Sequence, residues 1–410
     1  MNIKSLFLSS TAAFLAISGA HAASAPVAEP EPVEYIRVCD AYGKGYFYIP
    51  GTETCMRLSG SVRADFIGGD NIDATNETEL KNKRKTYSAS SRLTLVFQAA
   101  SETEMGTLRS YARIFSSWGD GTNKAGARLS AAYIELGGFR VGLDDTIFNT
   151  WVGGYGNVLN DDSIAPAGTT RTNFISYTFN GDSGFSAIIG AEIGNNADKL
   201  PGVAELRSGN DEYVGQYIEK DGKLVSLTND TLPSKAIKNY TPNVVLGIKF
   251  MQKWGGFSAV AAYDAYYKKW AGKIRTDFNV NDRFNLWVMA GYKNGTDYYT
   301  EDKDNPGELS RRSTTIYANW GGKWAAWAGA TYKLTPKADL NAQVSYSAVK
   351  TFATSVNIAY TLVPGFVITP ELTYVSWNDD RVIKDANNNE KHFFHGKSAF
   401  QGMIRLQRSF

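Results

Sequence analysis

The stretch Phe352-Ala-Thr-Ser-Val-Asn-Ile-Ala-Tyr-Thr-Leu-Val363 alternates apolar residues with small or polar ones along most of its length. Its even positions include Val356, Ile358 and Leu362, whereas its odd positions are mostly alanine, serine, asparagine or threonine. Residues 340–348 repeat the alternation. A period of two puts one set of side chains on each face of a β-strand. Several neighbouring strands of this kind predict a sheet with one apolar and one polar face.

The amino terminus has the features of a secretory signal. Lys4 gives a positive start, residues 6–17 are mostly apolar, and Ala20-His-Ala22 forms a small-x-small cleavage site. The apolar run is too short for a transmembrane helix, which needs about 20 residues. We therefore expect residues 1–22 to be a signal peptide. In an exported chain the apolar face of the sheet is expected to meet lipid and the polar face to line a lumen, which predicts an all-β, transmembrane antiparallel β-barrel in the outer membrane.

The composition agrees with this prediction without proving it. The formal net charge is +2 and hydrophobic residues make up 43% of the chain, as in many soluble proteins. A barrel spreads its apolar residues over alternate positions, so averaged hydropathy does not reveal it. The aromatic content of 13% is typical of proteins with aromatic girdles at both membrane interfaces. The nearly balanced charge gives no support to nucleic-acid binding.

The spacing of turn signals predicts about 16 strands, and an even number brings both ends of the barrel to the periplasmic side. Long connections at 68–86, 145–171, 194–241, 294–321 and 378–391 alternate, with two short exceptions, with tight turns. A further strand at 313–320 would change the count. The predicted strands are 56–67, 87–99, 106–116, 127–136, 139–144, 172–180, 184–193, 242–253, 257–267, 271–280, 283–293, 322–334, 339–348, 352–363, 366–377 and 392–410.

Two cysteines, Cys39 and Cys55, precede the first predicted strand. In an oxidising compartment they favour a disulfide that closes a short loop, worth about 3 kcal/mol on the chain-entropy model. A metal site is the alternative, but no histidine lies between them. Residues 23–34 are rich in Ala, Pro and Glu and are expected to form a linker. The expected organisation is thus an N-terminal segment at 23–55 followed by a barrel at 56–410.

The segment Glu34-Tyr-Ile-Arg-Val-Cys-Asp-Ala-Tyr-Gly-Lys-Gly-Tyr-Phe-Tyr-Ile-Pro-Gly-Thr-Glu-Thr-Cys55 resembles the start of mature alphaproteobacterial porins of the Brucella and Rhizobium type. Residues 171–179 resemble the strand that follows the constriction loop of general porins, and Phe410 is similar to their closing aromatic residue. Arg408 departs from the pattern, because an apolar residue is usual at its parity. The resemblance implies a homotrimeric, 16-stranded channel for passive diffusion of small hydrophilic solutes and ions.

The resemblance also implies that the connection from Asp145 to Arg171 folds into the lumen as a constriction loop. The residues support this, because Gly153, Gly154 and Gly156 permit a tight inward path. Further along, Asp161 and Asp162 would supply negative charge. Two more acids at the start of the connection, Asp144 and Asp145, are assigned to the same constriction. An ordinary exposed loop with solvated acids is the alternative.

Five arginines of the first strands fall on the polar parity, and an arginine facing the lipid midplane would cost ~2–4 kcal/mol. We therefore expect them to point into the lumen, where arginines opposite acids would create a transverse field. Alternatively, some lie at the interfaces and reach toward lipid headgroups or lipopolysaccharide phosphates. The five are Arg57, Arg63, Arg92, Arg109 and Arg113.

Two other functions are weighed against a porin. A receptor or adhesin would use the long connection 194–241, and an outer-membrane hydrolase would need His392 or His395, the two histidines after the signal. No Ser/His/Asp arrangement, phosphate-binding loop, metal site or cofactor motif is evident, so an enzyme is not expected.

Overall fold

The structure is a computed structural model that describes residues 37–74, 80, 86–119, 122–123, 126–153, 156–166, 171–193, 216–220, 223–227, 240–295, 297–301, 309–313, 315–379, 382–384, 390–392 and 394–410. Val38–Phe410 form one compact unit, and Met1–Arg37 are a separate unit. The expected signal peptide at 1–22 and the linker at 23–34 lie outside the described residues.

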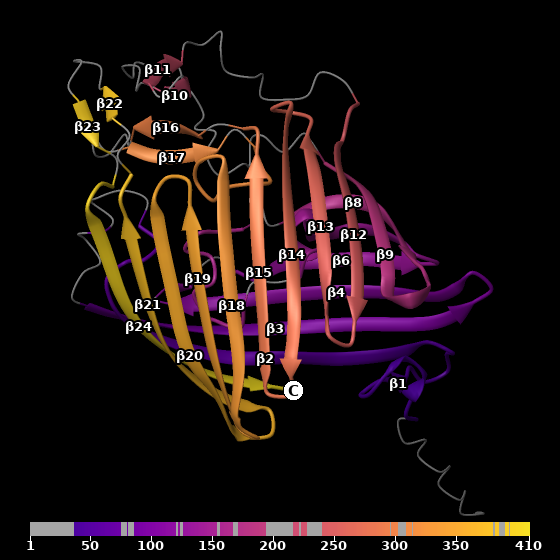
Figure 1. The fold of residues 1–410 in the computed structure, drawn as a ribbon. Coiled ribbons are helices and arrows are strands. Elements are labelled where there is room, and N and C mark those ends of the chain that lie inside the picture. Colours follow the sequence, from indigo (N-terminus) through magenta and orange to yellow (C-terminus); the bar gives the residue numbers. More distant parts are fainter. Residues whose placement is uncertain are drawn as a thin grey trace, which may run out of the picture. The chain divides into compact units, whose positions relative to one another are not determined.

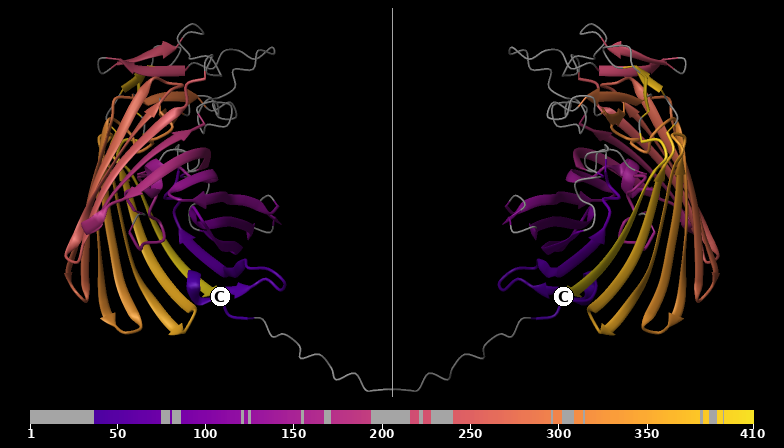
Figure 2. Two further views of the ribbon diagram at one scale, coloured as in Figure 1. Left: turned by 90° about the vertical axis from the view of Figure 1, so that its right-hand side faces the viewer. Right: turned by 90° about the vertical axis from the view of Figure 1, so that its left-hand side faces the viewer.

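Sixteen antiparallel strands of the described chain form the closed wall of a barrel (Figure 1). Each pairs with the next, and β24 pairs with β2, with Ser409 opposite Ser61. The backbone N–H and C=O of Gly60 complete the closure by bonding those of Phe410 at 2.9 and 3.0 Å. Figure 2 shows that the strands are tilted within the wall that they form. They are β2 (Cys55–Gly69), β3 (Thr86–Thr103), β4 (Gly106–Gly119), β6 (Arg128–Leu136), β7 (Phe139–Asp145), β8 (Arg171–Asn180), β9 (Phe185–Glu192), β12 (Asn243–Gln252), β13 (Gly255–Asp264), β14 (Lys269–Asn281), β15 (Phe284–Lys293), β18 (Trp324–Thr335), β19 (Ala338–Ser347), β20 (Thr351–Val363), β21 (Phe366–Trp377) and β24 (Lys397–Ser409).

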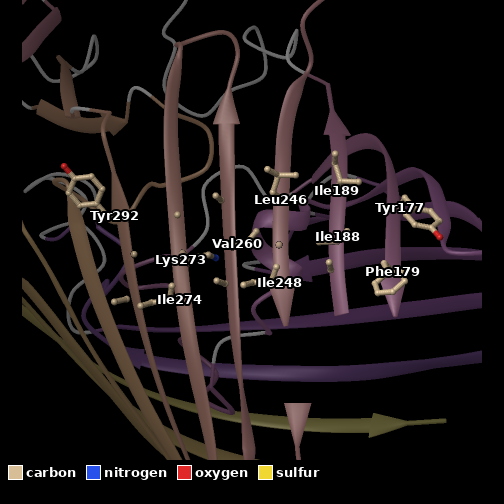
Figure 3. A pocket seen from close by; sticks show the side chains of 17 residues that line it. Tyr177, Phe179, Ile188, Ile189, Leu246, Ile248, Val260, Lys273, Ile274 and Tyr292 are labelled. Atoms are coloured by element: carbon tan, nitrogen blue, oxygen red, sulfur yellow. The ribbon is translucent and has the colours of Figure 1, made fainter. Parts of the chain in front are cut away.

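The two-residue period separates the faces of the wall as predicted. In β20, Val356 and Ile358 expose 42% and 40% of their surface, whereas Ser355 and Asn357 beside them expose 4% and 3%. Aliphatic and aromatic side chains of the other strands cover the outside in the same way. Figure 3 shows part of this surface, a shallow depression of about 810 Å³ on the outer side of β8–β15. Its almost wholly apolar lining suits lipid chains rather than a polar solute.

All sixteen predicted strands correspond to strands of the wall, with shifted ends. The possible further strand at 313–320, which would have changed the count, is not part of the wall. Residues 309–313 instead form β17 (Leu309–Ser313), which pairs with β16 (Asp297–Glu301) away from the wall, and residues 315–320 are irregular. Pro370 locally interrupts the pairing of β20 with β21, where the register passes from Asn357–Glu371 to Tyr360–Ile368, because proline has no N–H to donate.

Small sheets lie at the end of the barrel opposite Phe410 (Figure 1). Strands β10 (Gln216–Lys220) and β11 (Lys223–Leu227) join β16 and β17 in a four-stranded sheet, and β22 (Val382–Lys384) pairs with β23 (Glu390–His392). The helices in the described part of the chain are all too short or too polar to span a bilayer.

Arg408 is accommodated at the rim near the tight turn between β20 and β21. Its Nη1 donates to the carbonyl oxygens of Pro364 at 3.3 Å and Ser409 at 2.7 Å. The guanidinium therefore has protein acceptors beyond the apolar band, which explains how a charged residue can stand at this parity.

Cys39 and Cys55 form the predicted disulfide, with Cα atoms 6.1 Å apart. The bond packs with Tyr46 and with Ala100 of β3. Here β1 (Phe47–Tyr48) pairs with the start of β2, and this pairing attaches the N-terminal segment to the end of the first wall strand. A short 3-10 helix, η1 (Asp40–Tyr42), completes the clipped segment.

Replacing both cysteines by serine is expected to loosen this segment and to leave the barrel intact. The disulfide is worth about 3 kcal/mol on the chain-entropy model, and it constrains residues 39–55, whereas the strands pair with each other independently of it. Limited proteolysis should then cut between Cys39 and Cys55 in the double serine variant and not in the oxidised wild type. On a gel run without heating, the double serine variant should still migrate as a folded barrel. Loss of that folded band together with the disulfide would show that the barrel depends on the bond.

Candidate functional site

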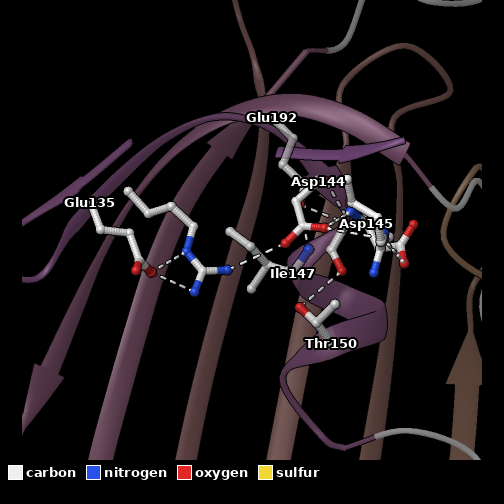
Figure 4. Close-up of polar contacts among 9 residues, drawn as sticks. Glu135, Asp144, Asp145, Ile147, Thr150 and Glu192 are labelled. Atoms are coloured by element: carbon white, nitrogen blue, oxygen red, sulfur yellow. Dashed lines mark hydrogen bonds and ion pairs between the residues drawn. The ribbon is translucent and has the colours of Figure 1, made fainter. Parts of the chain in front are cut away.

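The connection between β7 and β8 enters the barrel through a one-turn helix, α2 (Ile147–Thr150). The carboxylate of Glu192 in β9, only 1% exposed, accepts from the hydroxyl of Thr146 and the backbone N–H of Ile147, both at 2.8 Å. Thr146 in turn accepts from the N–H of Phe148 at 3.3 Å. Helix starts leave N–H groups without helical partners, so these contacts fix the direction in which the loop departs. Figure 4 shows Glu192 beside Ile147.

The loop then follows the inner side of the wall. The indole N–H of Trp151 donates to the carbonyl of Ile248 in β12 at 3.1 Å. Further on, the N–H of Gly156 donates to Gln343 in β19 at 3.0 Å. A Cβ at Gly156 would lie 2.9 Å from the same amide oxygen and 3.2 Å from the ring of Trp287, so a larger residue would require the Gln343 side chain to move. The expected inward path is thus observed, and the exposed-loop alternative is excluded by these contacts.

Glu371 of β21 holds the tip of the loop. Its carboxylate, 2% exposed, accepts from the backbone N–H groups of Leu159 and Asn160, the latter at 2.7 Å. The side-chain amide of Asn160 donates to the hydroxyl of Thr373 at 3.1 Å and to the amide oxygen of Gln401 in β24 at 3.5 Å. One buried carboxylate therefore satisfies two adjacent backbone donors of the loop, an arrangement that leaves the tip little freedom.

A second segment, residues 315–320, also folds inward and supports α2. The N–H of Ile316 donates to Asp264 at 2.9 Å, and the hydroxyl of Tyr317 donates to Glu192 at 2.7 Å. The ring of Tyr317 contacts Phe148 edge-on, with centroids 5.4 Å apart. Glu192 therefore ties both inward segments together. No sequence pattern marks this second segment as inward, because its partners lie on other strands.

A fully buried lysine fixes the carboxyl end of the same segment. Lys293 of β15 donates to Asp297 at 2.9 Å, to Ser313 at 2.8 Å and to the carbonyl of Ala318 at 2.9 Å. These three acceptors match the three hydrogens of the ammonium group, so the charge is compensated inside the barrel.

The facing wall carries a row of arginines on its inner side, here called the arginine row. Arg63 lies directly across from Arg92 on the neighbouring strand. Asp65 receives Arg405 at 2.6 Å and lies 3.3 Å from Arg63. Arg92 donates to Ser117 at 3.0 Å, and its guanidinium stands over the ring of Phe115. The row comprises Arg405, Arg63, Arg92, Arg113, Arg171 and Arg140.

Asp144 and Asp145 lie among these arginines and not opposite them. Arg113 approaches Asp144 at 3.8 Å and Asp145 at 3.7 Å, and Arg171 approaches Asp145 at 3.8 Å. Arg140 bridges Glu135 at 2.6 Å and Asp144 at 3.4 Å, near the start of α2 (Figure 4). These acids therefore hold the guanidinium groups in place and reduce, without cancelling, the positive charge of the row.

Arg57 and Arg109 are separated from the row. Arg109 is opposite Ala100, which is itself opposite Cys55. A Cβ added to Gly45 of the disulfide-clipped segment would lie 3.8 Å from Nε of Arg57. Both arginines thus lie at the disulfide end of the wall, and only Arg63, Arg92 and Arg113 of the five predicted arginines belong to the row.

Asp161 and Asp162 lie at the end of the loop tip. The carbonyl of Asp161 accepts from Gln343 at 3.2 Å, whereas Asp162 is exposed. Burial, followed by repulsion from Asp162, raises the pKa of the Asp161 carboxyl from 3.8 to about 7, although Arg405 opposes the shift. Asp161 therefore titrates near neutral pH.

Several residues of the site were missed by the sequence reasoning. Glu371, Asp65 and Arg405 all stand at the inward parity of predicted strands, so the rule applied to the first arginines would have placed them in the lumen. Glu192 ends its strand, where parity is less informative. In the described residues no group of three or more His, Cys, Asp or Glu side chains is arranged to hold a metal ion.

Comparison with known proteins gives consistent matches. Residues 24–403 match the family described as the porin subfamily. The chain is 40% identical to Porin Omp2b of Brucella suis over 420 residues and 38% identical to Porin Omp2a of Brucella canis over 431 residues, in both cases over the full length of the two chains.

Among solved structures, the outer membrane channel DcaP of Acinetobacter baumannii aligns with a TM-score of 0.59 at 13% identity, covering 88% of this chain and 99% of that one. A mutant of the porin of Rh. blastica aligns with a TM-score of 0.52 at 13% identity, covering 87% and 100%. At such identities these structures establish the likeness of the fold.

Proposed function

The chain belongs to the porin subfamily and is an outer-membrane β-barrel channel, and from that premise we propose that it passes small hydrophilic solutes and ions by passive diffusion between the inward loop and the arginine row. The observation that carries the proposal is the path of the loop, which is held against the inner wall by Glu192 at its start and Glu371 at its tip. A barrel of this size leaves an aqueous lumen, and the loop narrows it.

The charges of this passage support a selectivity role. Asp161 and Asp162 contribute negative charge from the loop, and the arginine row contributes positive charge from the facing wall. Charges separated by less than a Debye length, about 10 Å at 0.1 M salt, are not fully screened. We assign the constriction to Asp161, Asp162, Arg63, Arg92 and Arg113, with Asp144 and Asp145 orienting the arginines. Arg57 and Arg109 are assigned to the periplasmic mouth.

The selectivity should depend on pH through Asp161. Because the pKa of this carboxyl is raised to about 7, it is neutral at lower pH and negative at higher pH. The preference for cations is therefore expected to rise between about pH 6 and pH 8. Zero-current potentials in a salt gradient measure it, and Asp161→Asn should remove the step. Asp282→Asn, in a short turn, is the control that should retain it. A wild type without a step in this range would contradict the assignment.

The same proposal includes cleavage of the signal peptide and the lipid that surrounds the barrel. Cleavage after Ala22 would leave residues 23–55 as a periplasmic segment clipped by the disulfide, and the apolar outer face would contact outer-membrane lipid and lipopolysaccharide. The receptor alternative depends on residues 194–241, most of which lie outside the described structure. The relatives are named as porins, not as enzymes, and nothing favours the hydrolase alternative.

We expect the protein to be a homotrimer, on the strength of the family resemblance. Three-fold symmetry would close a heterologous contact into a ring. Native mass spectrometry in a mild detergent should give three times the mass of the processed chain. A monomer under conditions that keep the barrel folded would contradict this expectation.

A further inference from the structure

Two members of the arginine row, Arg63 of β2 and Arg92 of β3, face each other directly across neighbouring strands. Both side chains are on the inner face of the wall. The Cβ atoms of directly opposite residues in an antiparallel pair are about 4.5–5.5 Å apart, and like charges in these positions destabilise a sheet. The stability of the wall therefore gives no reason for this pair, unless a negative charge lies between the two guanidinium groups.

Asp65, the carboxylate beside the pair, is already engaged. It accepts from Nε and Nη2 of Arg405 at 2.6 and 3.0 Å, a bidentate contact that uses both of its oxygens. Nε of Arg63 is 3.3 Å from Asp65 but has no hydrogen bond in the described chain. Within the described residues Arg92 has no ion pair, and its Nε donates to the hydroxyl of Ser117 at 3.0 Å. Three guanidinium groups thus face one carboxylate, which leaves an excess of two positive charges.

The terminal nitrogens of the pair are open to the lumen. Arg63 exposes 24% of its side chain and Arg92 is half-buried, and their Nη atoms have no hydrogen-bond acceptor in the part of the chain that the structure describes. The guanidinium of Arg92 stands 4.9 Å from the centroid of the Phe115 ring, and that of Arg171, 39% exposed, stands 5.4 Å from the same centroid. A guanidinium stacked on a ring keeps its N–H edge available. A solute in the lumen can therefore reach these edges.

The chemistry of these groups selects the class of guest. A guanidinium fork donates two parallel N–H bonds to a pair of oxygens, a match that carboxylate and phosphate groups offer and a halide does not. A carboxylate brings one charge and two oxygens, whereas a tetrahedral dianion brings two charges and four oxygens. The dianion therefore matches both the excess of two positive charges and the two forks of Arg63 and Arg92. Arg171, which shares the Phe115 ring with Arg92, is placed to donate to a further oxygen.

We propose that Arg63, Arg92 and Arg171 bind a divalent tetrahedral oxyanion, sulfate or hydrogen phosphate, at the constriction. This inference rests on the proposed channel function and adds a class of solute to it. Such an anion is concentrated at the narrowest part of the passage, so its flux saturates as its concentration rises. The flux of an uncharged solute of the same size, which has no partner in the arginine row, stays proportional to its concentration.

The test is isothermal titration calorimetry of the folded protein in a nonionic detergent, at about pH 8 and constant ionic strength. Sodium sulfate and sodium phosphate are the probes, and sodium acetate and sodium nitrate are the monovalent comparisons. Both dianions should bind saturably with a dissociation constant on the order of 1 mM. Both monovalent anions should bind at least about tenfold more weakly, because they carry half the charge.

Variants of the pair separate charge from geometry. Arg92→Gln, which removes one fork and one charge, should weaken the binding of sulfate by about tenfold or more. Arg92→Lys keeps the charge but not the fork, and it should bind sulfate about threefold more weakly than the wild type. Arg109→Gln is the matched control, because it removes an arginine from the same wall at its disulfide end, and it should stay within about twofold of the wild type.

The proposal is overturned if either dianion fails to bind, if acetate or nitrate binds as tightly, or if Arg92→Gln binds as the wild type does. An equal loss of affinity in Arg109→Gln, or full affinity in Arg92→Lys, would also overturn it. Should Arg92→Gln not fold, Arg63→Gln carries the same prediction. Conductance in potassium chloride measures the channel without any oxyanion. Absence of binding in a conducting protein would therefore remove the site and leave the proposed function in place.

Discussion

Deleting residues 157–162 is expected to raise single-channel conductance roughly twofold, as an order of magnitude for a pore that loses its narrowest constriction. This deletion removes the part of the loop that Glu371 holds, and it keeps α2 with its contacts to Glu192. The strands of the wall keep their pairing, because residues 157–162 take part in none of the strand ladders of the described chain. Planar-bilayer recordings at high salt measure the change with little contribution from charge.

Glu371→Ala provides the matched comparison, since it keeps the loop and removes one of its anchors, while Gln343 still bonds Gly156 and Asp161. The N–H groups of Leu159 and Asn160 would then lack their acceptor, at ~1–3 kcal/mol each. We expect a fluctuating current rather than a steady increase, because the loosened tip remains in the lumen on its other contacts. If both variants conduct as the wild type does, residues 157–162 do not limit the pore, and another segment sets the constriction.

The second large effect is expected from the arginine row. Replacing Arg92 and Arg113 by Gln should shift the zero-current potential toward cations. At about 7 Å and an effective dielectric constant of about 80, each lost charge changes the energy of a passing ion by about 0.6 kcal/mol, or about threefold in preference, and by more at lower dielectric. Loss of Arg113 also removes one of the two arginines near each of Asp144 and Asp145, which acts in the same direction.

Arg109→Gln is the control for this pair, because it removes the same charge from the same strand at the disulfide end. Its effect should be distinctly smaller. Asp161→Asn combined with Asp162→Asn should shift the potential toward anions. The shifts should shrink at 1 M salt, where the Debye length is about 3 Å. Equal shifts for Arg109→Gln and Arg113→Gln would mean that the row does not define the selective region.

The wall was predictable because its signal is local. Alternation along each strand, as between Ser355 and Val356, separates lipid from lumen wherever the strand lies, and turn residues divide the strands. The same rule assigns Arg63, Arg92 and Arg113 to the inner face. Applied further, it would have found Glu371 and Arg405, whose neighbours Leu372 and Ile404 are outward and exposed.

The contacts between the inward loop and the wall could not be predicted from the alternation of residues along the strands. Asn160 meets Gln401 across 241 positions of sequence, and Leu159 meets Glu371 across 212. No periodicity encodes such pairs, because they depend on how far strands are staggered around the ring. The position of Asp144 illustrates this, since an acid expected to oppose the arginines instead lies beside Arg140 and Arg113.

The anchors of the inward loop also imply an order of assembly. The loop leaves the wall after β7, but its tip is held by residues of β21 and β24, which are made last during synthesis. Contacts across so many residues form only after the intervening chain has been brought together. The loop must therefore wait, unseated, until the ring has formed. Narrowing of the pore is then the final step of maturation, and a barrel arrested before its last strands would be wide and unselective.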